Sequence, residues 1–258
     1  MKIQGYGWIR DLPDQRDLRY APPTQLAEAL PPMVDLRDGF PPSYDQGALG
    51  SCTANAIAGA LQYLERKEGD TTPTMPSRLF IYYNERVIEG SVDSDSGAQL
   101  RDGIKVVHKE GFCPEAEWPY DIARFADPPP RQCYQDALRE CVSQYLRLDR
   151  GMPLLTCLAS GYPFVFGFSV YESFESERVR RSGIAPLPEP GEQLLGGHAV
   201  CAVGYDLNKR TYLVRNSWGT DWGLEGYFTM PFDYLATPRL SADFWTLRQV
   251  PIEAAMAA

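Results

Sequence analysis

Residues 46–64 read Gln46-Gly-Ala-Leu-Gly-Ser-Cys52-Thr-Ala-Asn-Ala-Ile-Ala-Gly-Ala-Leu-Gln-Tyr-Leu64. A glycine-rich loop leads into a run whose apolar residues recur at helical spacing, and Gly69 predicts where that helix ends. The first helical residue is Cys52, so its thiol faces the positive end of the helix dipole, which favours the thiolate. The stretch therefore predicts a helix that presents a nucleophile, although a small cysteine that only packs beneath the loop has the same local sequence.

A nucleophilic thiol needs a base, and the chain has 2 histidines. His108 lies near the end of a predicted helix, where a structural role is expected. His198 follows Gly196-Gly197 at the start of an apolar strand, and these glycines let another chain approach it closely. Asn216-Ser-Trp-Gly219 comes directly after a further strand, and an amide there can orient an imidazole. Taken alone, each piece also fits a core histidine or an ordinary turn.

Together these pieces resemble the papain-like cysteine peptidases, over roughly residues 33–232. The chain order of Gln46, Cys52, His198 and Asn216 is the order of the family's catalytic residues, and Asn216 to Tyr227 resembles the block around its catalytic asparagine. The resemblance implies that Gln46 stabilises an oxyanion, that Cys52 attacks the scissile carbonyl as a thiolate paired with the His198 imidazolium, and that Asn216 orients His198. It also implies a substrate-binding role for four further residues: Ser96, Gly97, Gly197 and Trp218.

The sequence departs from the common family pattern around the nucleophile. The usual Cys-Gly-Ser-Cys-Trp is Leu49-Gly-Ser-Cys-Thr53 here, and Glu192 stands where plant-type members have a bridged cysteine. The disulfide framework of the lysosomal and plant enzymes is therefore missing, as is their long helical inhibitory prosegment. The sequence is more similar to the bacterial, short-leader branch of the family.

The predicted fold class is α+β, as in the two-lobed papain-like fold, with the active-site cleft between the lobes. We expect an N-terminal arm at 1–32 and a peptidase domain at 33–258, divided into a helical lobe at about 40–150 and a β-barrel-like lobe at about 151–250. Helices are expected at 52–69, 77–87, 96–111, 134–148 and 153–159. Strands are expected at 164–171, 199–205, 211–214 and 227–230.

Two hypotheses remain open for the arm. It is rich in proline and charge, and Trp8 and Tyr20 are candidate apolar anchors. The arm either lies in cis over the active-site groove or straps the fold together without touching the site. The family's pocket for the P2 side chain of the substrate is expected to have small walls, namely Ala98, Gly167, Gly196 and Ala199, and so to favour a bulky apolar or aromatic residue.

Composition limits the possible partners. Hydrophobic residues make up 44% and charged residues 23%, with a net charge of −9, so a nucleic acid is not an expected partner. The 6 cysteines include no Cys-x-x-Cys pair, which makes a metal site improbable and favours reduced, buried thiols. No cofactor and no membrane span are expected. The start lacks the apolar region of a Sec signal peptide, so a cytoplasmic location and export by a non-Sec route both stay open.

The predicted function is cysteine-type peptide hydrolysis, with a peptide or protein as the substrate and a thioester as the acyl-enzyme intermediate. An acyl-transfer enzyme that passes the thioester to an amine has the same catalytic residues. A non-catalytic binding or effector module with this fold usually lacks one of them, whereas this chain has all four.

Overall fold

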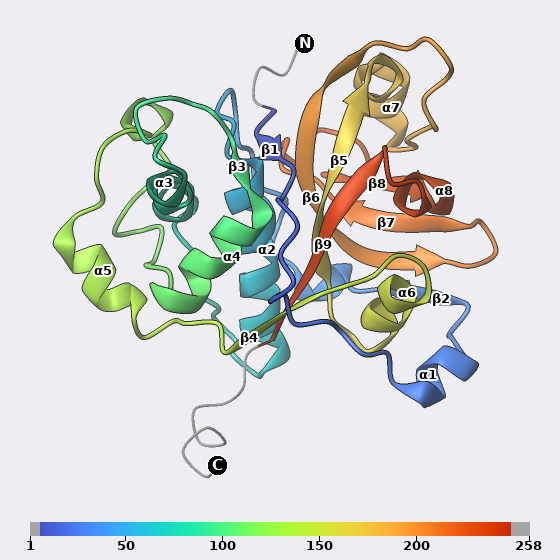
Figure 1. The fold of residues 1–258 in the computed structure, drawn as a ribbon, viewed down its shortest axis with the longest axis horizontal. Coiled ribbons are helices and arrows are strands. Elements are labelled where there is room, and N and C mark those ends of the chain that lie inside the picture. The colour runs from blue at the N-terminus through green and yellow to red at the C-terminus, as the bar shows by residue number, and fades with distance from the viewer. Residues whose placement is uncertain (1–5, 249–258) are drawn as a thin grey trace.

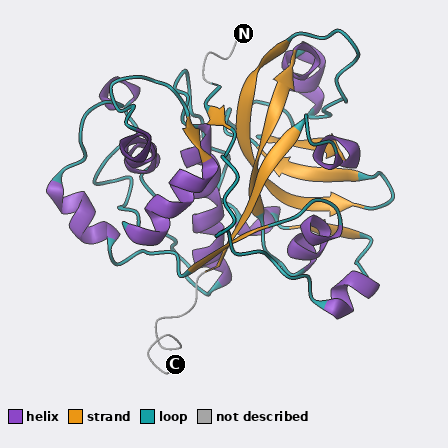
Figure 2. Cartoon of the chain, in the orientation of Figure 1, coloured by secondary structure: helices purple, strands orange, loops and turns teal. Residues whose placement is uncertain are grey.

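The computed structural model describes residues 6–248 and has a helical half and a sheet half, drawn side by side in Figure 1 and Figure 2. The helices of the first half are α2 (Cys52–Lys67), α3 (Arg78–Glu89), α4 (Leu100–Lys109) and α5 (Arg131–Ala137). Those of the second half are α6 (Met152–Ala159), α7 (Glu177–Ser182) and α8 (Phe232–Ala236). The arrangement confirms the predicted α+β fold with two lobes.

Helix α2 lies against the sheet half and forms the centre of the molecule. Every residue from Cys52 to Glu65 is buried, because α3 and α4 pack on one side of α2 and strand β6 (Leu194–Asp206) packs on another. Gly69 follows the helix with φ +103°, a left-handed conformation that glycine adopts without strain. The helix therefore ends where the sequence predicts, and its first residue is held at the interface between the lobes.

The sheet half is built around two long central strands, β5 (Phe164–Tyr171) and β6. The strand order is β4-β9-β5-β6-β7-β8, and β2 (Met33–Asp35) also pairs with β6. The remaining strands are β4 (Gln144–Arg147), β7 (Thr211–Arg215), β8 (Tyr227–Pro231) and β9 (Ser241–Arg248). Among the described residues β4 and β8 are not paired with each other, so the sheet is not a closed barrel. Phe164, Phe166 and Phe168 point into a core beneath α6, α7 and α8.

Two sequence predictions are wrong in this part of the chain. The expected helix at 134–148 is the end of α5 followed by strand β4, which pairs antiparallel with β9 from Gln144↔Arg248 to Arg147↔Trp245. Strand β9 itself was not predicted. The two errors have one cause, since both strands depend on pairing with distant parts of the chain: β4 pairs with β9, about a hundred residues away, and β9 pairs with β4 and with β5.

The N-terminal arm runs along the interface between the lobes, as the dark-blue trace in Figure 1 shows. It contains a short strand β1 (Trp8–Ile9), which pairs in parallel with β3 (Ala98–Gln99), and a short helix α1 (Thr24–Glu28). No helix within residues 6–248 has both the length and the apolar character needed to cross a membrane.

Candidate active site

Cys52 lies at the first position of α2, at the interface between the lobes. Its Sγ accepts a hydrogen bond from the backbone N–H of Ala199 at 3.3 Å. Ala199 directly follows His198 in β6, so the predicted nucleophile and the predicted base, far apart in the sequence, come together across the interface. Both side chains are fully buried, with exposed fractions of 0%.

Asn216 follows strand β7 and determines which nitrogen of His198 carries the proton. His198 Nε2 lies 2.8 Å from Asn216 Oδ1, and the same oxygen accepts the backbone N–H of Ser217 at 2.9 Å. Because a backbone N–H only donates, this end of the amide is the oxygen, and His198 Nε2 must be a donor. In the neutral imidazole Nδ1 is then the acceptor, and it has no hydrogen-bond partner among the described residues.

Trp218 stacks on the imidazole. The ring centroids of Trp218 and His198 are 4.8 Å apart with an interplanar angle of 24°, and Trp222 and Phe174 pack edge-on against Trp218. The indole shields the His198–Asn216 hydrogen bond from water and fixes the plane of the imidazole.

Gln46 is held in the loop that precedes α2. Its Oε1 accepts from the Ser217 hydroxyl at 2.6 Å, and its Nε2 donates to the Leu49 carbonyl at 2.9 Å. The backbone oxygen of Gln46 accepts from the Tyr120 hydroxyl at 2.9 Å. These contacts orient the amide beside the loop that leads to Cys52. Ser217 was not singled out from the sequence, although it lies next to Asn216 in the same motif.

The arm occupies the space in front of these side chains. The Gly7 carbonyl accepts the Ala98 N–H at 2.7 Å, and the Gly7 N–H points at the Cys52 thiol. A Cβ at Gly7 would lie 1.6 Å from the Gly50 carbonyl oxygen, so only glycine fits at this point of the arm. Tyr6 lies over the imidazole, with its ring centroid 6.2 Å from that of His198.

Of the predicted substrate-binding residues besides Trp218, the two glycines contact the arm. A Cβ at Gly97 would lie 2.2 Å from the Gly7 carbonyl oxygen, and one at Gly197 would lie 2.5 Å from the Trp8 carbonyl oxygen. Ser96 is exposed and bonds the Ser91 hydroxyl at 2.9 Å, so its side chain turns away from the arm. The arm backbone therefore takes the place in which the resemblance puts the substrate.

Trp8 fills the pocket that the sequence assigned to a substrate side chain. A Cβ at Gly167 would lie 1.9 Å from its indole, whereas one at Gly196 would meet Tyr6. The indole Nε1 donates to Asp243 Oδ2 at 3.2 Å. Asp243 is 2% exposed and has φ +58°, a strained conformation for a residue other than glycine, at an irregularity in the pairing of β5 with β9. Sequence reasoning missed Asp243 because β9 was not recognised.

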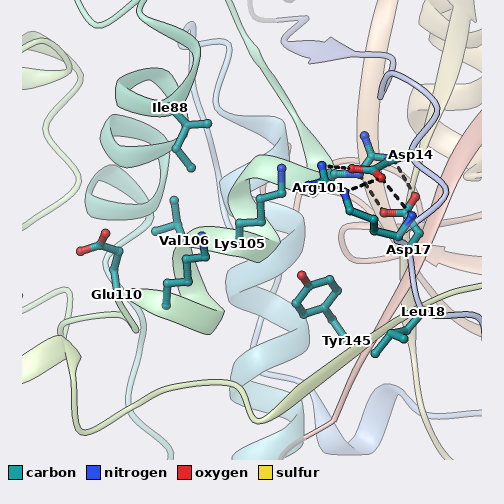
Figure 3. A pocket seen from close by; sticks show the side chains of 11 residues that line it. Asp14, Asp17, Leu18, Ile88, Arg101, Lys105, Val106, Glu110 and Tyr145 are labelled. Carbon is teal, nitrogen blue, oxygen red and sulfur yellow. Dashed lines mark hydrogen bonds and ion pairs between the residues drawn. The ribbon is translucent and has the colours of Figure 1, made fainter.

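Further along, the arm is clamped by buried charges. Asp11 accepts hydrogen bonds from the Trp245 indole and the Arg101 N–H and donates its own N–H to Asp243. Asp17 pairs with Arg101 and with Arg147, at 2.7 Å each. Figure 3 shows Asp14 and Asp17 beside Arg101, and these residues line a cavity of about 530 Å³ together with Lys105 and Tyr145.

Burial under the arm decides the charge of the catalytic pair. Loss of water raises the pKa of the Cys52 thiol to about 12, although hydrogen bonds from Ala199 and Gly7 act in the opposite direction. The same loss of water lowers the pKa of His198 to about 4, against the effect of Asn216. In the arm-covered structure both shifts favour a neutral thiol and a neutral imidazole over the ion pair.

The sequence predicts no metal site. Within residues 6–248, Cys113, Glu117 and Cys133 bring three ligand atoms within 4.8 Å of one another, far from the catalytic pair in the sequence. His108 is separate from both groups: its Nδ1 lies 2.7 Å from the Val142 carbonyl, in keeping with a structural role.

The comparisons with known proteins agree with this geometry. The family model for papain family cysteine proteases matches residues 30–235. The crystal structure of xylellain, a cysteine protease from Xylella fastidiosa, superposes with a TM-score of 0.90 and 46% identity over 96% of this chain and 97% of that one. An uncharacterised peptidase C1-like protein of Acanthamoeba polyphaga mimivirus is 43% identical over 96% of this chain and 88% of its own.

More distant relatives share the domain but are longer. Cathepsin J of Mus musculus is 29% identical over 80% of this chain and 61% of its own. Digestive procathepsin L 3 of Tenebrio molitor, at 20% identity and a TM-score of 0.71, shares the fold. The similarity to xylellain supports the expected resemblance to the bacterial branch. A family model that spans most of the chain, together with two relatives above 40% identity, shows that this protein belongs to the papain family of cysteine proteases.

Proposed function

We propose that this cysteine peptidase cleaves peptide bonds through Cys52 and His198. The observation that carries the proposal is the pairing of His198 Nε2 with Asn216 Oδ1, which leaves Nδ1 as the acceptor, in a residue whose neighbour Ala199 donates its backbone N–H to the Cys52 thiol. Nδ1 takes the thiol proton, the thiolate attacks the substrate carbonyl, and the imidazolium then protonates the leaving amine. Water hydrolyses the thioester in the reverse sequence of proton transfers.

Gln46 and the Cys52 backbone N–H are the proposed donors to the oxyanion of the tetrahedral intermediate. The Ser217 hydroxyl at Oε1 fixes which end of the Gln46 amide carries the donor, so the amide needs no reorientation during the reaction. A pre-oriented donor of this kind typically contributes about 10²–10³ to kcat.

In the observed conformation the N-terminal arm blocks the active site, so this conformation is a latent form of the peptidase. Gly7 and Trp8 occupy the positions beside Gly97 and Gly197 that a substrate backbone needs, and the Cys52 thiol is fully buried beneath them. Of the two hypotheses for the arm, coverage of the site is therefore favoured, while the ion pairs of Asp17 add a strap. Departure of the arm rehydrates the thiol and the imidazole, which moves both pKa values back toward the range in which the ion pair forms.

Trp8 indicates the side chain that the P2 pocket favours. An indole fits between Gly167 and Gly197 and donates a hydrogen bond to Asp243 at the base of the pocket. We therefore expect a preference for bulky aromatic P2 residues, with tryptophan favoured over phenylalanine because phenylalanine cannot replace the hydrogen bond that Asp243 Oδ2 accepts from an indole. A positional peptide library tests this expectation, and a preference for Gly or Asp at P2 would contradict it.

Replacement of the nucleophile tests the proposed mechanism. Cys52→Ala should abolish peptide hydrolysis and labelling by a thiol-directed epoxide while leaving the melting temperature nearly unchanged. Cys141→Ala is the matched control, because that thiol is partly exposed and lies outside the site. Mass spectrometry of the products with and without an added amine distinguishes hydrolysis from acyl transfer. Substantial hydrolysis by Cys52→Ala would refute the mechanism. If the otherwise unchanged protein leaves the peptide uncleaved even after the arm has been removed, the result would favour a non-catalytic module.

A further inference from the structure

Two cysteines outside the active site face each other in the helical lobe. Cys113 follows the turn at Gly111, and Cys133 lies in the first turn of α5. Their sulfur atoms and a carboxylate oxygen of Glu117 lie within 4.8 Å of one another. Both cysteines are at most 1% exposed.

The segment between these cysteines supports the loop of the nucleophile. Its start is fixed by the Ser77 N–H, which donates to the Cys113 carbonyl at 2.8 Å, and by the Ser77 hydroxyl, which donates to the Trp118 carbonyl at 2.7 Å. Further along, the Tyr120 hydroxyl bonds both the Gln46 carbonyl at 2.9 Å and the Ser51 hydroxyl at 2.5 Å. A covalent link between the two ends of this segment would hold Tyr120 against the loop.

We propose that Cys113 and Cys133 are a redox-sensitive pair that closes to a disulfide in an oxidising environment. The reaction is exchange with a small disulfide such as oxidised glutathione. The Cys133 thiolate attacks one sulfur of glutathione disulfide and releases one glutathione thiolate. Cys113, as a thiolate, then attacks Cys133 in the mixed disulfide and releases the second glutathione. The protein loses two thiol protons and two electrons, and one glutathione disulfide becomes two glutathione thiols.

A metal ion is the competing occupant of the same three side chains, and two observations disfavour it. Structural zinc is bound by four protein ligands, whereas the described residues supply three here. Glu117 itself is exposed, which leaves its carboxylate to water.

The test uses the full chain in glutathione buffers of defined redox potential. Peptide mapping after oxidation should find a Cys113–Cys133 link, and the melting temperature should rise by about 5–10 °C because the link restricts the unfolded chain. The link should be absent in Cys133→Ser and retained in Cys141→Ser. Glu117→Gln should form the link several-fold faster at neutral pH, because the repulsion that opposes the thiolate is gone.

Three results would overturn the proposal. The first is a stable glutathione adduct on Cys133 that Cys113 does not resolve. The second is the absence of a link at potentials that oxidise ordinary protein dithiols. The third is stoichiometric zinc in the reduced protein that Glu117→Gln or Cys133→Ser removes, which would assign the three side chains to a metal. Peptide mapping detects the Cys113–Cys133 disulfide whatever the melting temperature of the variant, so a destabilised variant still gives a result. The outcome is also independent of peptidase activity.

Discussion

Removal of the Trp8 side chain should release the arm from the active site. The indole is half-buried between Gly167 and Gly197 and donates to the buried carboxylate of Asp243. Truncation of a fully buried Trp to Ala costs about 3–5 kcal/mol, and a hydrogen bond to a charged group contributes about 1.5–3 kcal/mol. For a half-buried ring that makes one such bond, we expect Trp8→Ala to weaken arm docking by about 3 kcal/mol. Since 1.4 kcal/mol is a factor of ten, the population of molecules whose arm has left the active site (the open state) rises about 100-fold.

The assay is the rate at which a thiol-directed epoxide labels Cys52. While the open state is the minor one, the labelling rate is proportional to its population, so Trp8→Ala should label about 100-fold faster than the parent chain. Tyr20→Ala is the matched control. Tyr20 is also half-buried, but its hydroxyl lies 3.4 Å from Ser160 Oγ, outside the site, so its truncation should leave the labelling rate nearly unchanged.

Two results would refute the reasoning. If Trp8→Ala labels as slowly as the parent chain, the indole does not hold the arm over Cys52. If Trp8→Ala and Tyr20→Ala accelerate labelling equally and lower the melting temperature equally, the arm acts as a strap and exposes Cys52 only through general loosening of the fold.

Three further outcomes are expected. Gly7→Ala should also accelerate labelling, because its Cβ would lie 1.6 Å from the Gly50 carbonyl oxygen; an unchanged labelling rate would contradict the close approach. Burial and the neighbouring Asp243 raise the pKa of Asp11 to about 7, so docking takes up a proton, is strongest below about pH 4 and weakens as the pH rises through 7. Asp11→Asn should flatten this pH dependence. The measurement is the labelling rate of Cys52 at each pH, divided by the labelling rate of a small free thiol at the same pH, and an unaltered pH profile in Asp11→Asn would contradict the role of Asp11. Asn216→Ala should lower kcat about 10²-fold with little change in KM, because the imidazole loses its orientation; a change confined to KM would assign Asn216 to binding instead.

Most elements of the helical lobe were predictable because their signals are local. Apolar spacing and a terminal glycine define α2, and the Ser77 hydroxyl caps α3 by accepting the Phe80 N–H at 3.1 Å. The β-rich runs of β5 and β7 likewise carry their own pattern. By contrast β4 is a strand because it pairs with β9, which itself pairs with β5 on its other side, and no residue near Gln144 indicates that pairing.

The residues of the candidate site likewise fall into two groups: those with a local sequence signal and those identified only by their tertiary contacts. Cys52, His198 and Asn216 stand in motifs whose residue types and chain order point to thiol chemistry before any fold is known. Asp243 and Ser217 have no such signal, because their importance lies in what they touch: Trp8 in one case and Gln46 in the other. The protonation state of the catalytic pair also follows from tertiary burial, since the same thiol and imidazole in water would have ordinary pKa values.

The sequence by itself determined the family, the order of the catalytic residues and the helix that presents the thiol, because each depends on neighbours along the chain. Only the tertiary structure decided where the arm lies. The pocket of Trp8 is assembled from Gly167, Gly197 and Asp243, and the clamp on Asp17 from Arg101 and Arg147. These contacts join residues that are distant in the chain, and a sequence pattern carries no record of which buried carboxylate or which glycine will lie beside a given side chain. That is the physical reason why the covering of the active site by the protein's own arm was one of two open hypotheses before the fold was known.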